Sequence, residues 1–220
     1  MDEVAAAVRA VRAGDVEELA GLLAEHPDLV TARVEGPRTL LHVLADHPGH
    51  RPRAAETVRV LVGAGADVDA RFSGPHVETP LHWAASNDDV GTIDALLDAG
   101  AWIDAPGAVL GGGSPLADAC GFAQWHAAAR LVERGAAVTL EQAAALGRDD
   151  DVARLAGSAD REDLDVALWY ACHGGQLVTA QGLAARGADP RARMPWEPAT
   201  ALEAAGQAGA DDVVAWLRVR

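Results

Sequence analysis

Thr79-Pro80-Leu81-His82-Trp83-Ala84-Ala85-Ser86 is the stretch that decides the fold, together with the segment Thr92-Ile93-Asp94-Ala95-Leu96-Leu97 that follows it. Thr79 is a favoured helix N-cap, and Pro80 fits the first helical position because the N–H that it lacks has no partner there. The apolar residues of the second segment recur at helical spacing, and Gly100 can end that helix in the left-handed conformation that other residues avoid. The stretch therefore predicts two short helices joined by a tight turn.

The same pattern recurs along the chain. Similar helix starts occur at Thr39-Leu40-Leu41-His42 and at Ser114-Pro115-Leu116-Ala117. The glycine ending recurs at Gly65-Ala66-Asp67, Gly135-Ala136 and Gly187-Ala188-Asp189. A pair of short helices cannot bury its apolar face alone, so neighbouring pairs must stack on one another.

These repeats resemble the ankyrin repeat family, and residues 79–105 match its signature at nearly every position. The resemblance implies an all-α, ankyrin-type solenoid of stacked helix-turn-helix repeats, with hairpin or loop fingers between them. Weaker copies extend the pattern over the whole chain, so a single domain is expected over residues 1–220. Its seven repeats, the first and last acting as caps, are predicted at about 3–37, 38–77, 78–113, 114–138, 139–160, 161–198 and 199–220.

Two repeats depart from the pattern. Residues 47–53 add length and two prolines to the second repeat, which predicts a loop between its helices. The fifth repeat, 139–160, is short and lacks the Gly-Ala-Asp ending, so a kink in the stack is expected there. Fingers are expected at 72–78, 106–113 and 193–198.

The composition excludes several kinds of chemistry. All 18 basic residues are arginine, 33 residues are acidic, and the formal net charge is −15. Enzymes that form a Schiff base and nucleotide-binding proteins with a Walker loop need a lysine, which this chain lacks. The acidic excess would be repelled by a phosphate backbone, so we expect no nucleic-acid partner.

Other features of the sequence bear on the cellular location of the protein and on its source organism. An acidic start and the lack of an apolar run of about 20 residues predict a cytoplasmic protein with no membrane contact. The alanine and arginine bias suggests a GC-rich bacterial genome. Cys120 and Cys172 are expected to be buried, reduced thiols, because they lie two repeat steps apart.

The resemblance implies a function in binding, because partners of this family usually contact the concave groove formed by the first helices and the fingers. We expect the partner to be a protein with a basic or neutral polar surface around an apolar centre, bound by a monomer with no cofactor. The alternative for the aromatic candidates is that they fill gaps between helices, and for Asp118 that it is a solvated carboxylate. The candidate contact residues are Trp83, Ser86, Asn87, Asp118, Phe122, Trp125, Trp169, Tyr170 and His173.

Other polar motifs are interpreted as structural. By resemblance, His42 and His82 hydrogen-bond the backbone of the adjoining finger, whereas His173 lies at a groove position and is the one histidine nominated as functional. The set His42, Asp46, His47 and His50 contains metal-ligand residue types, but the first has a structural role and the rest lie in or beside a loop, so we expect no metal site. Residues 111–113 are three glycines and predict a flexible finger.

Two alternative functions remain open. Long fingers at 106–113 and 193–198 could roof Trp83, Asp118, Tyr170 and His173 into a small-molecule pocket or an active site, with Asp118 and His173 as acid/base groups. The chain could also be a purely structural partner or an inhibitor of a neighbouring gene product. Nucleophile motifs give the enzyme hypothesis little support, because none of the four serines lies in Gly-x-Ser-x-Gly. An open groove would favour a protein partner, and a deep pocket would favour chemistry.

Overall fold

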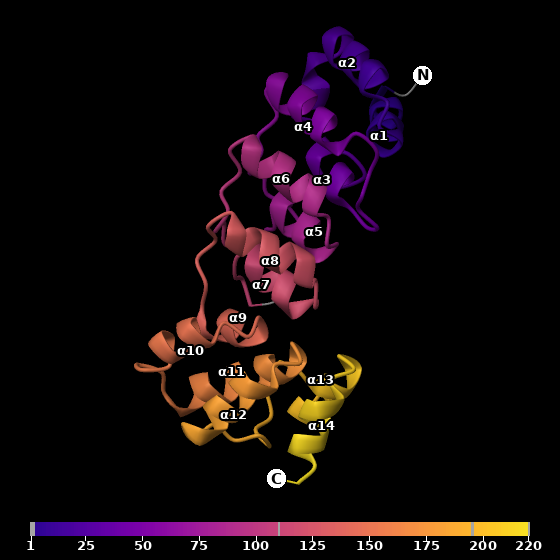
Figure 1. Ribbon diagram of the computed structural model, residues 1–220. Helices are drawn as coiled ribbons and strands as arrows, with labels where there is room; N and C mark the ends of the chain where they lie inside the picture. The colour runs from indigo at the N-terminus through magenta and orange to yellow at the C-terminus, as the bar shows by residue number, and fades with distance from the viewer. Residues whose placement is uncertain (1–2, 110, 195, 220) are drawn as a thin grey trace. The chain divides into compact units, whose positions relative to one another are not determined.

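The computed structural model describes residues 3–109, 111–194 and 196–219. These residues form fourteen α-helices that follow one another in pairs (Figure 1). An isolated bridge between Val34 and Arg38 is the one β-type pairing in these ranges, and they contain no strand. The contacts divide the chain into two compact units, unit 1 ending at Ala136 and unit 2 beginning at Ala137.

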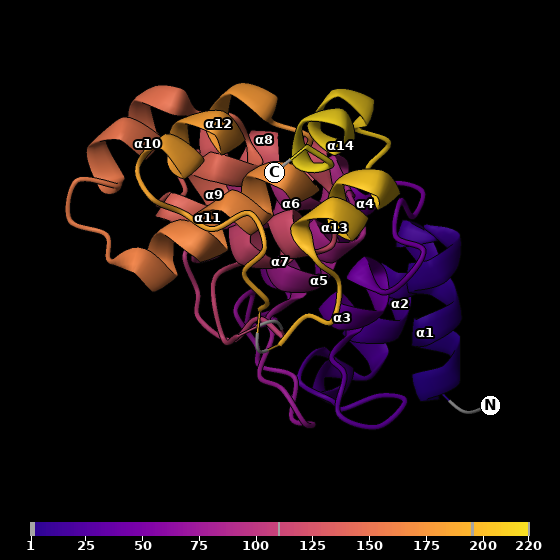
Figure 2. The same cartoon turned by 90° about the horizontal axis from the view of Figure 1, so that it is seen from below.

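Unit 1 contains four helix pairs. Along the unit, the first helices α3, α5 and α7 pack on one another, as do the second helices α4, α6 and α8. Figure 2 shows the two layers, with the connecting loops projecting beyond the layer of α3, α5 and α7. The helices are α1 (Glu3–Ala13), α2 (Val16–Glu25), α3 (Leu40–Ala45), α4 (Ala54–Gly63), α5 (Pro80–Ser86), α6 (Val90–Asp98), α7 (Pro115–Gly121) and α8 (Trp125–Glu133), with a 3-10 helix at Pro27–Val30.

Unit 2 contains three helix pairs. The long helix α11 packs on α9, α12 and α13 and is the centre of the unit. Its buried face includes Leu164, Ala167, Leu168 and Cys172. The helices are α9 (Leu140–Ala145), α10 (Asp149–Leu155), α11 (Arg161–His173), α12 (Leu177–Ala185), α13 (Ala201–Gln207) and α14 (Asp211–Leu217).

The local signals in the sequence produce the expected helix ends. Thr79 caps α5 with Pro80 at its first position, and Gly100 follows α6 with a φ of 94°. Residues 47–53 lie between α3 and α4, which confirms the predicted loop. One helix pair lies within each of the seven ranges expected for the repeats. That these pairs act as one domain stays a prediction, because the contacts give two units.

Fingers 72–78 and 106–113 are loops in their described residues, and residues 110 and 195 of the predicted fingers lie outside the described residues. The backbone N–H of Phe72 donates to the carbonyl of Glu78 at 2.8 Å, and the N–H of Ala108 donates to the carbonyl of Gly113 at 2.9 Å. Each bond closes the base of its loop. Within the described residues, none of the helices has the length and apolar character that crossing a membrane requires. Cys120 and Cys172 are buried and are not joined in a disulfide, as expected.

Candidate protein-binding surface

Buried histidines fix the fingers of unit 1 to its first helices. The Nδ1 atom of His42 accepts from the backbone N–H of Thr39, and its Nε2 atom lies 3.3 Å from the carbonyl oxygen of Glu78. His82 repeats this arrangement with Thr79 and with the carbonyl of Gly113. Burial lowers the pKa of both imidazoles to about 4, so they are neutral near pH 7. The structural roles expected for these histidines are confirmed.

The carboxylate of Glu78 organises the space between two fingers. Glu78 is 4 % exposed. Its Oε2 atom accepts the indole N–H of Trp83 at 2.9 Å, and its Oε1 atom accepts the backbone N–H of Val109 at 3.1 Å. The Nδ1 atom of His76 lies 2.6 Å from the same carboxylate. One buried side chain therefore connects finger 72–78, helix α5 and finger 106–113.

Trp83 lies in a cluster of rings that holds its indole in one position. Its ring centroid is 5.0 Å from that of His42, in an edge-on arrangement, and 5.3 Å from that of Phe72. Phe72 in turn stacks on His76 at 4.6 Å. The guanidinium carbon of Arg38 lies 5.4 Å from the Trp83 centroid, a cation–π distance. Because Glu78 already accepts the indole N–H, the part of Trp83 that remains exposed is apolar.

Two exposed valines adjoin this cluster. Val77 is 53 % exposed and precedes Glu78, and Val109 is 48 % exposed and donates its N–H to Glu78. We call Val77, Trp83 and Val109 the finger face. Apolar side chains that lie together on a surface, held in place by hydrogen bonds, are typical of a contact site. Neither valine is among the contact residues predicted from the sequence, although each is an apolar residue in a loop of mostly small and polar residues.

Both arginines and carboxylates lie beside the finger face. Arg33 donates to the carbonyl of Arg71 at 2.7 Å, and Arg71 donates to the carbonyls of Val77 and Pro106. Arg38 pairs with Glu35 and Asp46 at 3.3 and 3.4 Å. Arg33 and Arg71 each reach from one loop to the next, and each donates to neutral backbone carbonyls.

Asp118 requires a correction, because its side chain is fully buried. It occupies the position in α7 that Trp83 occupies in α5, but an aspartate side chain is much shorter than an indole and ends below the surface. Asp118 is neither a solvated carboxylate nor a contact residue in this structure. Of its neighbours, Phe122 is 43 % exposed and Trp125 is half-buried.

Ser86 and Asn87 are half-buried and use their polar groups within unit 1. The hydroxyl of Ser86 donates to the carbonyl of His82. The amide of Asn87 donates to the carbonyls of Ala45 and Trp83, both at 2.9 Å, and so connects the end of α3 to α5. Their hydrogen bonds stabilise the layer of first helices, and a role in contact with a partner stays a prediction.

Trp169 also requires a correction, because it is 6 % exposed and belongs to the core of unit 2. Its indole N–H donates to the carbonyl of Ala199 at 2.9 Å. The ring of His173 stacks on it at 5.0 Å, and Tyr170 meets it edge-on at 5.2 Å. Tyr170 and His173 are half-buried. For Trp169, packing between helices is therefore the correct interpretation.

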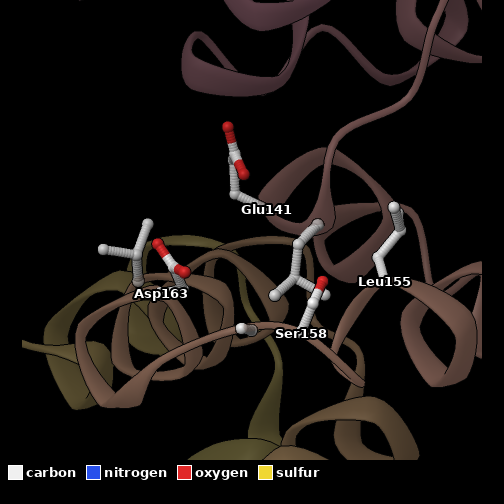
Figure 3. Close-up of a pocket in the computed structure, with 7 residues that line it drawn as sticks. Glu141, Leu155, Ser158 and Asp163 are labelled. Carbon is white, nitrogen blue, oxygen red and sulfur yellow. The ribbon is translucent and has the colours of Figure 1, made fainter.

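Unit 2 contains a cavity that the sequence analysis did not predict. Its volume is about 330 Å³, and Figure 3 shows Glu141, Leu155, Ser158 and Asp163 around it. It is lined by Leu140, Glu141, Leu155, Ser158, Ala159, Asp163 and Val166. Neither Asp118 nor His173 lines it, so it does not support acid/base chemistry by those residues. In the part of the chain that is described, no group of three or more histidine, cysteine or acidic side chains is placed to hold a metal ion.

Comparison with known proteins assigns the family. The family model for the ankyrin repeat matches residues 38–72 and 78–108, which contain the pairs α3–α4 and α5–α6. Among solved structures, the human ASB11 ankyrin repeat domain is similar over 96 % of this chain and 96 % of that domain, with a TM-score of 0.58 and 19 % identity. No curated protein sequence matches the chain. The chain has the all-α ankyrin fold, and it is an ankyrin repeat protein.

Proposed function

We propose that this protein is a binding scaffold whose finger face contacts a partner protein. Ankyrin repeats are generally protein-interaction scaffolds, and the chain contains them. The observation that supports this site is the Glu78 carboxylate, which accepts hydrogen bonds from Trp83 and from the backbone of Val109. It holds the finger face in position before a partner arrives, so little conformational entropy is lost on binding.

The chemistry of this surface fits an apolar contact with neutral polar groups around it. Val77 and Val109 supply aliphatic surface, and Trp83 supplies the large rigid ring that dominates interface energies. We expect the predicted groove of unit 1 to include this face, with Phe122 as a further contact. The contacts predicted for Tyr170 and His173 belong to unit 2 and stay a separate proposal.

Site-specific photo-crosslinking tests this proposal. A benzophenone amino acid is placed at Val77 or at Val109, with Val178 of α12 as the control because it is 70 % exposed and lies outside the finger face. In lysate of the native host, we expect one shared crosslinked protein from positions 77 and 109, and loss of that product when Trp83→Ala is added. Equal crosslinking from position 178 would count against the finger face.

Three further proposals rest on the sequence. A cytoplasmic location is the first, and a bacterial source, suggested by the bias toward alanine and arginine, is the second. A monomeric state is the third. Sedimentation of the purified chain at several concentrations would test the last, and a concentration-dependent mass would overturn it.

A further inference from the structure

The short fifth repeat has a cavity where the second and third repeats have a finger. Only residues 156–160 connect α10 to α11, whereas residues 64–79 connect α4 to α5 and residues 99–114 connect α6 to α7. Without a finger, the start of α9 and the first turns of α11 stay uncovered. The cavity of about 330 Å³ lies there, between α9, the end of α10 and α11.

The centre of this cavity is apolar. Leu140, Leu155, Ala159 and Val166 line it and pack against the core of unit 2, and all four are only partly buried. Figure 3 shows Glu141 rising from one helix and Asp163 lying on another, with Ser158 and Leu155 on the remaining sides. A space of this size lies at the lower end of the range for ligand pockets and accommodates one or two side chains of a partner.

The rim of the cavity carries negative charge. Residues 139–166 include eight acidic residues and three arginines, whereas the rest of unit 2 has five of each. The three arginines pair with Asp151, Asp165 and Asp189. Among the described residues, no arginine or histidine forms an ion pair with Glu141, Asp160, Glu162 or Asp163.

The carboxylates on α11 are also held in place. The backbone N–H of Asp160 donates to Asp163, and the backbone N–H of Asp163 donates to Asp160, at 3.1 and 3.0 Å. This capping box fixes Asp163 beside the cavity, where its carboxylate accepts a backbone N–H and forms no ion pair with a described residue. An apolar centre with a fixed anionic rim complements an aliphatic side chain next to a cation.

We propose that this cavity binds a partner-protein segment that presents an aliphatic side chain flanked by arginine or lysine. The aliphatic side chain enters between Leu140, Leu155 and Val166, and the cations meet Glu141 and Asp163. This second binding site is separate from the finger face, because it belongs to unit 2 and uses different chemistry.

Methyl NMR of the full chain with short peptides tests the proposal. The probes are acetyl-Arg-Leu-Leu-Arg-amide, the same peptide with glycines in place of the leucines, and the same peptide with glutamates in place of the arginines. We expect the first probe alone to shift the methyl signals of Leu140, Leu155 and Val166. Equal shifts with the glycine or the glutamate peptide, or no shift with the first, would overturn the proposal.

Matched variants locate the binding site. Glu141→Gln removes a charge that lines the cavity and should weaken binding of the first probe by about threefold, a typical size for a solvent-exposed charge pair. Glu162→Gln removes the same charge from a neighbouring position that does not line the cavity, and should change binding less. Ser158→Trp fills the cavity from an exposed position and should weaken binding by about tenfold or more.

The outcomes separate this site from the finger face. Unchanged methyl signals outside the cavity show that each variant is folded. If Ser158→Trp disturbs the fold, the comparison of Glu141→Gln with Glu162→Gln still tests whether the peptide binds at the cavity. Equal weakening by those two variants would mean charge attraction alone and would overturn the cavity site. Trp83→Ala should leave peptide binding unchanged, so failure of the finger face would not affect this result.

Discussion

The imidazole rings of His42 and His82 each form two kinds of hydrogen bond. Nδ1 accepts from the backbone of a helix cap, which leaves the proton on Nε2, and that N–H donates to the carbonyl of the adjoining finger. Both rings are fully buried. A neutral, buried ring with two partners stabilises the native state mainly because its loss would leave those partners unsatisfied.

His82→Ala should lower the free energy of unfolding by about 1–3 kcal/mol, because it removes the bond to finger 106–113 and leaves the Gly113 carbonyl without its donor. His126→Ala is the control, since 86 % of that side chain is exposed. Denaturant midpoints measure both. Equal losses for the two variants would show that the finger bond contributes little.

Stability should also fall as pH falls from about 6.5 toward 4. In the unfolded chain both histidines protonate near their ordinary pKa of 6.5, whereas burial lowers the folded-state pKa to about 4, so acid favours the unfolded state in this window. The loss should be on the order of 2–3 kcal/mol for each histidine at the lower end. Urea titrations from pH 7 to pH 5 test this, and a flat profile there would contradict it.

The sequence predicts structural residues better than contact residues. His42 and His82 stand at a motif position whose hydrogen-bond partner is the backbone of the adjoining finger, so their hydrogen bonds could be expected. Asp118 and Trp83 share a helical position, yet their side chains differ in length and therefore in exposure. The roles of Glu78 and Val109 depend on how two loops come together, which no local pattern encodes.

At the scale of elements, the helix pairs could be predicted because each carries its own start and stop signals. Thr79 and Pro80 at a start, and Gly100 after an end, act locally. The cavity in unit 2 could not be predicted in the same way. The short connection 156–160 was visible in the sequence, but which side chains its shortness uncovers depends on the packing of α9 against α11.

Gly174→Ala should destabilise unit 2 by about 1–3 kcal/mol or more, because α11 ends where it approaches α9 closely. A Cβ atom at residue 174 would lie 1.9 Å from the carbonyl oxygen of Ala145, which is a backbone atom and cannot rotate away. Gly206→Ala is the matched control within α13, where a Cβ atom meets nothing within 4 Å. Gly206→Ala should raise the free energy of unfolding by about 0.5–1 kcal/mol, because alanine favours the helix more than glycine does. Thermal unfolding of both variants would show whether the two changes have opposite signs.

At the scale of the whole molecule, the net charge of −15 affects how a partner approaches. Long-range attraction of a basic partner is screened within about 8 Å at physiological salt, whereas apolar contacts are not. Raising the salt concentration should therefore lower the association rate more than it raises the dissociation rate, and Trp83→Ala should act mainly on dissociation. Stopped-flow kinetics with the captured partner measure both. An association rate that does not depend on salt would mean that net charge has no part in recognition.

The two buried cysteines have a practical consequence for studying this protein. Cys120 is buried in unit 1 and Cys172 in unit 2, and burial raises the pKa of the Cys172 thiol to about 12. A thiol reagent needs an exposed thiolate, so each cysteine should be modified only when the unit that contains it opens. The natural chain thus carries one chemical reporter in each unit, and mass spectrometry of the two modified peptides would time their openings separately without any engineered label.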